Sequence, residues 1–184
     1  MSDLAQSFMD VDSFLAWSEG QDARFELHEG VVIAMAPERY AHLETKLAVV
    51  NALQAAIRSA GAPCRALPDG ATVRTSKKTA FVPDALVYCG PRPDPGALEI
   101  ANPVIVVEVL SPSTLRADFG VKLEAYFTIH SVAHYLIIDP DRRKVIHHAR
   151  GLGDVLQTRI IGEGALRLDP PGLELHVESL FGPD

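Results

Sequence analysis

The segment PVIVVEVL, residues 103–110, constrains the fold more than any other part of the chain. It is apolar except for Glu108, and a continuous apolar run of this length is typical of a strand buried on both faces of a sheet. Such sheets are covered by helices, so the segment predicts a single α/β domain with a mixed sheet. An isolated buried carboxylate is energetically costly, so the fold must also supply Glu108 with a counter-charge.

Helices and strands are predicted on both sides of this segment. A short helix is expected over residues 8–17, capped by Asp10 or Asp12, and a hairpin over residues 24–37. A long helix over residues 40–60 ends at Gly61 and Pro63, and a second helix is expected over about 118–129. The apolar positions of the long helix are Leu43, Leu47, Val50, Leu53 and Ile57. Further strands are expected at 64–67, 71–75, 81–88, 134–139, 144–150, 157–162, 165–168 and 173–177.

Length and composition indicate one globular domain over residues 1–184. Hydrophobic residues make up 47% and charged residues 22%, and no apolar run reaches the roughly 20 residues of a membrane span. No export signal is recognised, so a cytoplasmic protein without membrane contact is expected. Cys64 and Cys89 fit no metal spacing, and we expect two buried thiols in a reducing cytosol.

The net charge of -7 argues against broad electrostatic adhesion to nucleic acid, although it leaves room for a local basic cleft.

Two carboxylates stand within apolar strand patterns. Asp84 lies in FVPDALVY, 24 residues before Glu108, and pairing of the two strands would bring both acids into one site. Mg²⁺ takes carboxylate oxygens and would supply the counter-charge, while activating a bound water. Alternatively, each acid is satisfied by an arginine, a backbone N–H or solvent, which is the commoner arrangement for two arbitrary strand acids.

Pro83-Asp84 followed by Glu108 resembles the PD-(D/E)XK nuclease superfamily. The wider chain is similar to the bacterial Uma-two family, whose members are labelled restriction endonucleases. The matching stretches, over roughly residues 10 to 182, are RFELHEG, YAHLETKL, FVPDALVY, PVIVVEVLSPST, RADFGVKLEAY, HYLIIDPDRRKV and PGLELHVESLFG. The resemblance implies a restriction-endonuclease-like mixed sheet flanked by helices, with a core of about residues 24–150, an added N-terminal hairpin and added C-terminal strands. It also implies a homodimer.

The resemblance further implies a Mg²⁺-dependent endonuclease acting on DNA, with Mn²⁺ as a substitute metal. Asp84 and Glu108 match the metal-binding acids, joined by the backbone carbonyl of Val109. Glu26 matches an assisting acid of the early hairpin, and Lys122 matches the family's helix lysine, which would position the attacking water.

The chain departs from the simplest superfamily pattern at two places. A Glu-x-Lys strand would need lysine at position 110, where this chain has Leu110. Lys122 can substitute by reaching in from the second helix, where it borders the buried face; otherwise it forms a surface pair with Asp118. The second departure is Val31 after the hairpin turn, in place of the family's common acid, and we interpret it as turn variation.

Other polar residues have weaker claims to a site role. His42 and Lys46 lie one turn apart at the start of the long helix, where they could contact a substrate phosphate or serve structure alone. His147 and His148 are neighbours on a strand and must point to opposite faces, so they are not a ligand pair. The hydroxyls of residues 111–114 suit turns and caps as well as a site.

Three functions remain open at this point. A metal-dependent nuclease would need a positive groove beside Asp84 and Glu108, built from Arg24, Arg39, Lys46, Arg116 and Lys122. A scaffold or binding protein that keeps the nuclease fold as an inactive dimer is consistent with Leu110 and an acidic mouth. A hydrolase of small phosphate esters would need a closed pocket.

Overall fold

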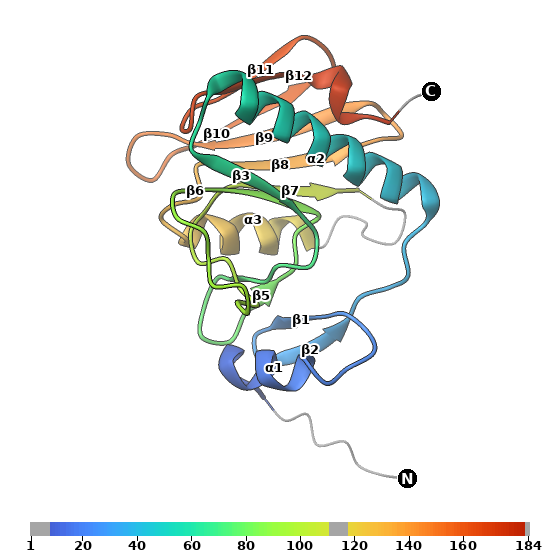
Figure 1. Ribbon diagram of the computed structural model, residues 1–184, viewed down its shortest axis with the longest axis vertical. Coiled ribbons are helices and arrows are strands. Elements are labelled where there is room, and N and C mark those ends of the chain that lie inside the picture. Colours follow the sequence, from blue (N-terminus) through green and yellow to red (C-terminus); the bar gives the residue numbers. More distant parts are fainter. Residues whose placement is uncertain (1–7, 111–117, 183–184) are drawn as a thin grey trace.

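A six-stranded mixed sheet forms the centre of the computed structural model, which describes residues 8–110 and 118–182 (Figure 1). The strand order is β10-β9-β8-β7-β6-β3, in which β7 and β8 are parallel and the other neighbours are antiparallel. The strands are β3 (Cys64–Pro68), β6 (Ala85–Cys89), β7 (Pro103–Val109), β8 (His134–Asp139), β9 (Lys144–Arg150) and β10 (Leu156–Ile161). The predicted mixed sheet is therefore confirmed.

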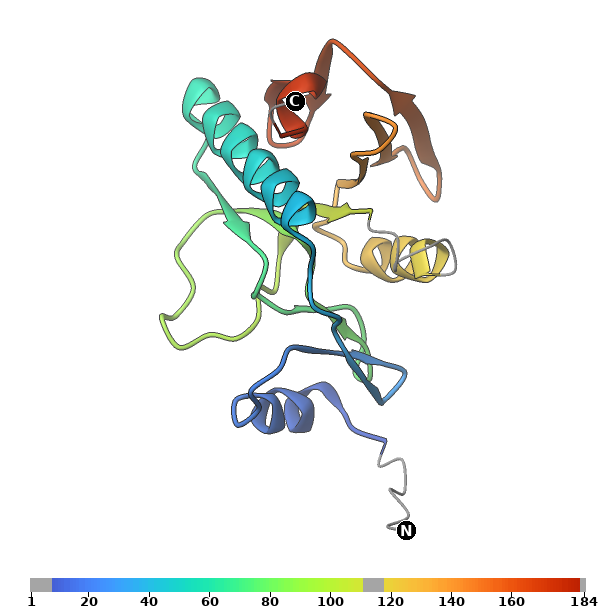
Figure 2. The same ribbon diagram turned by 90° about the vertical axis from the view of Figure 1, so that its right-hand side faces the viewer.

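Both faces of this sheet are covered. Helix α2 (Tyr40–Ala60), strands β11 (Ala165–Leu168) and β12 (Leu173–His176) and the 3-10 helix η1 (Val177–Leu180) lie on one face, and α3 (Asp118–Thr128) lies on the other (Figures 1 and 2). Because side chains alternate along a strand, Ile105 and Val107 pack toward α2 while Val106 packs toward Tyr126 of α3. The expectation that β7 is buried on both faces is confirmed.

A smaller antiparallel sheet carries the N-terminal hairpin, in the order β2-β1-β5-β4. It consists of β1 (Phe25–His28), β2 (Val31–Ala34), β4 (Val73–Arg74) and β5 (Ala80–Phe81), with α1 (Val11–Ser18) packed against it. Asp10 caps α1 by accepting from the backbone of Ser13. The two turn residues Glu29 and Gly30 both have positive φ, as a two-residue hairpin turn requires. Within the described ranges, no helix combines the length and apolar character needed to cross a membrane.

The structure differs from the expected elements near Asp84 and at the start of α2. FVPDALVY divides into β5 and β6, with Asp84 just before β6, because Pro83 has no N–H to donate to a ladder. Leu43 and Leu47 are largely exposed, while Lys46, which lies between them in the sequence, is buried. The first turns of α2 therefore present polar groups toward the protein interior, and the apolar spacing misidentified the buried face there.

The two cysteines form a disulfide, which corrects the expectation of free thiols. Cys64 and Cys89 lie directly opposite each other in the antiparallel pair of β3 and β6. Their separation of 25 residues conceals this pairing in the sequence. Disulfides are rare in a reducing cytosol, so this bond removes the argument that the cysteines made for a cytoplasmic location.

Loss of the disulfide should lower the stability of the fold. A Cys64→Ser, Cys89→Ser double variant should lose about 3 kcal/mol of unfolding free energy, because the unfolded chain is no longer cross-linked. Urea unfolding with and without reductant measures this. Reductant should destabilise the parent and leave the variant unchanged. Two titratable thiols in denatured parent protein prepared without reductant would contradict the bond.

A buried histidine pair joins β8, β9 and the turn between β11 and β12. The ring Nε2 of His134 lies 3.0 Å from the Pro170 carbonyl, and its Nδ1 lies 2.9 Å from Nε2 of His147. Nδ1 of His147 lies 3.3 Å from Nη2 of Arg159. Since Pro170 and Arg159 can act only as acceptor and donor here, both rings must be neutral. His148 contacts Thr158 instead, so the predicted opposite orientation of the two histidines is confirmed.

This pair should make the fold sensitive to acid. Burial lowers the pKa of His147 to about 3, with His134 and Arg159 contributing in the same direction. Its stabilisation is therefore complete above about pH 6.5, the value for an unfolded histidine, and is lost toward pH 3 at about 1.4 kcal/mol per pH unit. A His147→Gln variant keeps one donor and one acceptor and should unfold with a shallower acid dependence. Thermal melts between pH 8 and 4 test this, with the exposed His130→Gln as control; equal slopes for parent and His147→Gln would contradict it.

Candidate active site

A cavity of about 790 Å³ opens where the start of β6 and the end of β7 meet the first turn of α2. Its walls come from the hairpin, the segment before α2, the two strands and α3. Four predicted site residues, Glu26, Asp84, Glu108 and Lys122, line it together with Val109. Residues from five separate parts of the chain are thus brought to one place.

The two predicted metal ligands, Asp84 and Glu108, stand side by side. The β6–β7 register pairs Ala85 with Val107, the residues next to Asp84 and Glu108, and the charge of Asp84 acts on Glu108. The Val109 backbone N–H donates to Oδ2 of Asp84 at 2.6 Å, which ties Asp84 to the strand that carries Glu108. The predicted adjacency of the acids holds, although Asp84 precedes its strand.

Lys122 reaches into the site from α3. Its Nζ lies 3.0 Å from Oε1 of Glu26 and 3.1 Å from Oε1 of Glu108. Oε1 of Glu26 also accepts from the Val82 backbone N–H at 2.9 Å. Leu110 packs with the apolar cluster on the α3 side of the sheet, so a helix lysine stands beside Glu108 where the strand offers only an apolar side chain. The alternative pair with Asp118 involves a side chain outside those that the structure describes.

Glu108 receives its counter-charge from Lys122 and a further hydrogen bond from the hydroxyl of Tyr126, 2.8 Å from Oε1. Burial raises the pKa of Glu108 to about 7; the charge of Lys122 opposes this rise, and the neighbouring Asp84 and Glu26 add to it. Burial also disfavours the Lys122 ammonium, but the two carboxylates outweigh burial and raise its pKa. Lys122 therefore remains a cation shared between two acids.

A second buried lysine neutralises Asp84. Nζ of Lys46 lies 3.1 Å from Oδ1 of Asp84, 2.8 Å from Oε1 of Glu38 and 2.7 Å from Oδ2 of Asp69. Arg24 also pairs with Glu38 and Asp69. Sequence reasoning missed Glu38 and Asp69: Asp69 lies in a Pro-Asp-Gly turn and Glu38 precedes a helix, where acids usually serve structure. Lys46 is absent from the cavity wall, so its predicted substrate contact is not supported by its position.

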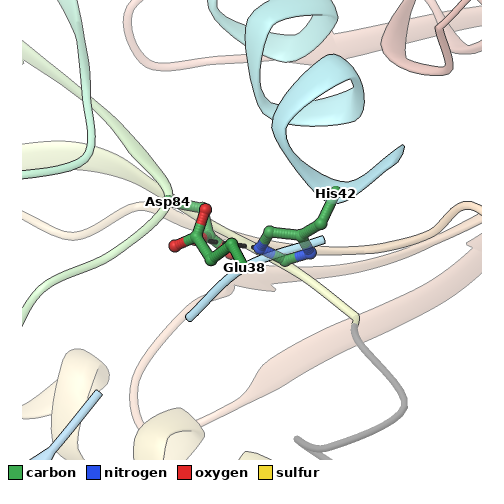
Figure 3. Close-up of side chains that lie close together, drawn as sticks. All are labelled: Glu38, His42 and Asp84. Atoms are coloured by element: carbon green, nitrogen blue, oxygen red, sulfur yellow. Dashed lines mark ion pairs between the residues drawn. The ribbon is translucent and has the colours of Figure 1, made fainter. Parts of the chain in front are cut away.

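His42 faces Asp84 from the first turn of α2 (Figure 3). Its Nε2 lies 3.5 Å from Oδ1 of Asp84, and its buried Nδ1 has no hydrogen-bond partner among the described residues. Burial opposes protonation of His42, but the contact with Asp84 outweighs it and raises the pKa. Burial likewise disfavours the Asp84 anion, yet His42, Lys46 and the Val109 N–H together lower its pKa. Asp84 is therefore ionised.

The ligand atoms of Glu38, His42 and Asp84 lie within 4.8 Å of one another, close enough to hold a metal ion (Figure 3). Lys46 already contacts both of the acids in this group. A metal ion bound there would compete with a buried ammonium for the same oxygens.

The charges of the site do not balance. Its five carboxylates face three permanent cations, so two negative charges are uncompensated when Glu108 is ionised and His42 is neutral, and the raised pKa values of both groups reduce this excess near pH 7. The acids are Glu26, Glu38, Asp69, Asp84 and Glu108, and the cations are Arg24, Lys46 and Lys122. The cavity wall adds Asp141 and Arg39. The described mouth is thus acidic and not the positive groove that the sequence required of a nuclease. Arg116 and residues 111–114 lie outside the described residues.

Removing the Lys122 charge should destabilise the fold. A Lys122→Met variant leaves Glu26 and Glu108 buried without their shared cation and should lose about 3 kcal/mol of unfolding free energy. The exposed Lys77→Met provides the control and should differ from the parent by less than about 0.5 kcal/mol. Urea unfolding at pH 7.5 measures both. Equal stability of the two variants would show that Lys122 is not the counter-charge of these acids.

Comparisons with known proteins agree with this fold. A family model described as "Uma2: Putative restriction endonuclease" matches residues 11–178. The chain is 27% identical over 176 residues to the uncharacterized protein slr1290 of Synechocystis sp. (strain ATCC 27184 / PCC 6803 / Kazusa), covering 92% of this chain and 90% of that protein. A crystal structure described as "a putative nuclease belonging to DUF820", from Anabaena variabilis ATCC 29413, superposes with a TM-score of 0.72 at 19% identity, over 94% of this chain and 97% of that one. The match over most of the chain shows that this protein belongs to the Uma2 restriction endonuclease family.

Proposed function

We propose that the protein is a metal-dependent endonuclease that hydrolyses DNA phosphodiester bonds. The observation that carries the proposal is the pair Asp84 and Glu108, which line one cavity beside a cluster in which carboxylates outnumber permanent cations. A divalent cation bound by the ionised pair would supply positive charge to this cluster. Family membership and the nuclease description of the matching crystal structure support the same reaction class.

The donor set fits Mg²⁺. Carboxylate oxygens of Asp84 and Glu108 and the carbonyl of Val109 are hard oxygen ligands, which Mg²⁺ and Mn²⁺ prefer. When bound, such an ion supplies charge neutralisation at the phosphate and a more acidic water. The two acids would hold the ion, and the short bond from the Val109 N–H would keep Asp84 against β7.

The remaining polar residues would act around the metal ligands. Lys122 would hold its ammonium beside Glu108 to orient the attacking water and stabilise developing negative charge. Glu26 would keep Lys122 in place from the opposite side. His42 lines the cavity and would contact the substrate, whereas buried Lys46 would position Asp84. Homodimerisation is a further expectation of the resemblance, and a cytoplasmic location is a further expectation of the sequence, in which no export signal is recognised.

A second candidate is an inactive nuclease-fold protein that serves as a scaffold or binding protein. The acidic cavity mouth favours it, since a polyanion is repelled by uncompensated negative charge and by the overall charge of -7. Leu110 in the usual lysine position also favours this second candidate. A small phosphate ester would also fit a cavity of about 790 Å³.

Nicking of supercoiled plasmid in Mg²⁺ or Mn²⁺ distinguishes these functions. The parent should nick the plasmid, and an Asp84→Asn, Glu108→Gln double variant should be at least about 100-fold slower because it lacks both ligand charges. Asp141→Asn, which removes an acid of the cavity wall outside the charge cluster, should stay within about twofold of the parent.

Equal nicking by parent and double variant would trace the activity to a contaminant. No nicking by any of the three, together with no Mn²⁺ binding in calorimetry, would overturn the nuclease and leave the scaffold. Cleavage of a small phosphodiester without plasmid nicking would replace DNA by a small ester as the substrate.

A further inference from the structure

We propose that Tyr126 is a positioning residue of this site, whose hydroxyl orients the Glu108 carboxylate for metal binding. The inference rests on the proposed metal-dependent function and goes beyond it, because that function assigns no role to Tyr126. Its basis is the geometry of a single buried hydrogen bond and of the rings around it.

The Tyr126 hydroxyl has a charged partner inside the core. The residue is fully buried, and a phenol hydroxyl that is buried needs a hydrogen-bond partner. That partner is Oε1 of Glu108, which accepts the bond at 2.8 Å. Burial and the nearby charge of Glu108 raise the pKa of Tyr126 well above its usual range, so the hydroxyl keeps its proton and acts as the donor.

Tyr126 and Lys122 converge on the same carboxylate oxygen. They lie four residues apart on α3, and residues at this spacing share one face of a helix. Nζ of Lys122 lies 3.1 Å from Oε1 of Glu108, the atom that Tyr126 also contacts. Among the described residues no donor lies within hydrogen-bond distance of Oε2. Two donors on one oxygen therefore hold the carboxylate, and Oε2 is the oxygen that carries no donor from the described residues and that we assign to a metal ion.

Neighbouring aromatic rings keep the hydroxyl in place. The Tyr126 ring centroid lies 5.7 Å from that of Phe81 and 5.2 Å from that of Tyr135. The same Phe81 ring lies 5.2 Å from Nζ of Lys122. The Phe81 ring thus lies beside both groups that donate to Glu108, the Tyr126 phenol and the Lys122 ammonium. Core packing alone would be satisfied by phenylalanine, and the hydroxyl adds a bond only to Glu108.

A metal titration separates positioning from packing. Calorimetry with Mn²⁺ on the full chain should show binding about tenfold weaker for Tyr126→Phe than for the parent, the loss typical of an outer partner of a metal ligand. Tyr88→Phe is the matched control: Tyr88 is buried in the same apolar cluster, away from the cavity, and should bind Mn²⁺ within about twofold of the parent.

Kinetics provide a second readout that a packing role would not change. In plasmid nicking, the Mg²⁺ concentration for half-maximal rate should rise about tenfold in Tyr126→Phe. The KM for plasmid at saturating Mg²⁺ should stay unchanged, since the hydroxyl holds a metal ligand and does not contact DNA.

Rescue uses 4-aminophenylalanine at position 126. This residue keeps the ring and one polar hydrogen donor, so Mn²⁺ affinity should return to within about threefold of the parent. It also serves as the test variant if Tyr126→Phe fails to fold, which thermal melts against Tyr88→Phe would reveal.

The outcomes separate this inference from the function on which it rests. Unchanged Mn²⁺ affinity in folded Tyr126→Phe, with normal binding by the parent, would overturn the positioning role alone. A folded 4-aminophenylalanine protein that stays as weak as Tyr126→Phe would also overturn it. No Mn²⁺ binding by the parent would overturn the metal-dependent function and the positioning role together.

Discussion

The shared pairing of Lys122 with Glu26 and Glu108 joins the main parts of this structure. Glu26 belongs to the small sheet, Glu108 to the central sheet and Lys122 to the helix that connects β7 with β8. Lys46 repeats the arrangement from α2, where it holds Asp84. Buried ion pairs rarely add net stability over well-packed apolar residues, so their presence indicates that the site serves a purpose other than folding.

Placing the lysine on a helix changes how the site is built. The strand position two residues after Glu108 is given to Leu110, which packs with the core, while α3 supplies both a cation and a phenol to the same carboxylate. One helix face thus performs two tasks, because residues 122 and 126 are a single turn apart. The arrangement supplies Glu108 with a counter-charge from the protein itself, although carboxylates still outnumber permanent cations in the whole cluster.

Local patterns predicted most of the elements. The bounds of α2 and the strands of the C-terminal half agree with the apolar periodicity and with the glycine and proline positions. Errors arose where contacts between distant segments decide which side chains meet. Cys64 and Cys89 are joined only because β3 and β6 align them, and the buried face at the start of α2 is polar because Glu38, Asp69 and Asp84 gather there. Neither effect leaves a periodic signal in the chain.

The sequence by itself determined the class of fold and the presence of one carboxylate, Glu108, in a buried strand, since such a strand requires both a covered sheet and a counter-charge. Only the tertiary structure decided which cations pair with Glu108 and Asp84, that Glu38 and Asp69 join them, and that Tyr126 bonds to Glu108. The physical reason is that strand and helix periodicity follow from neighbouring residues, whereas ion pairs depend on distances between residues far apart in the chain.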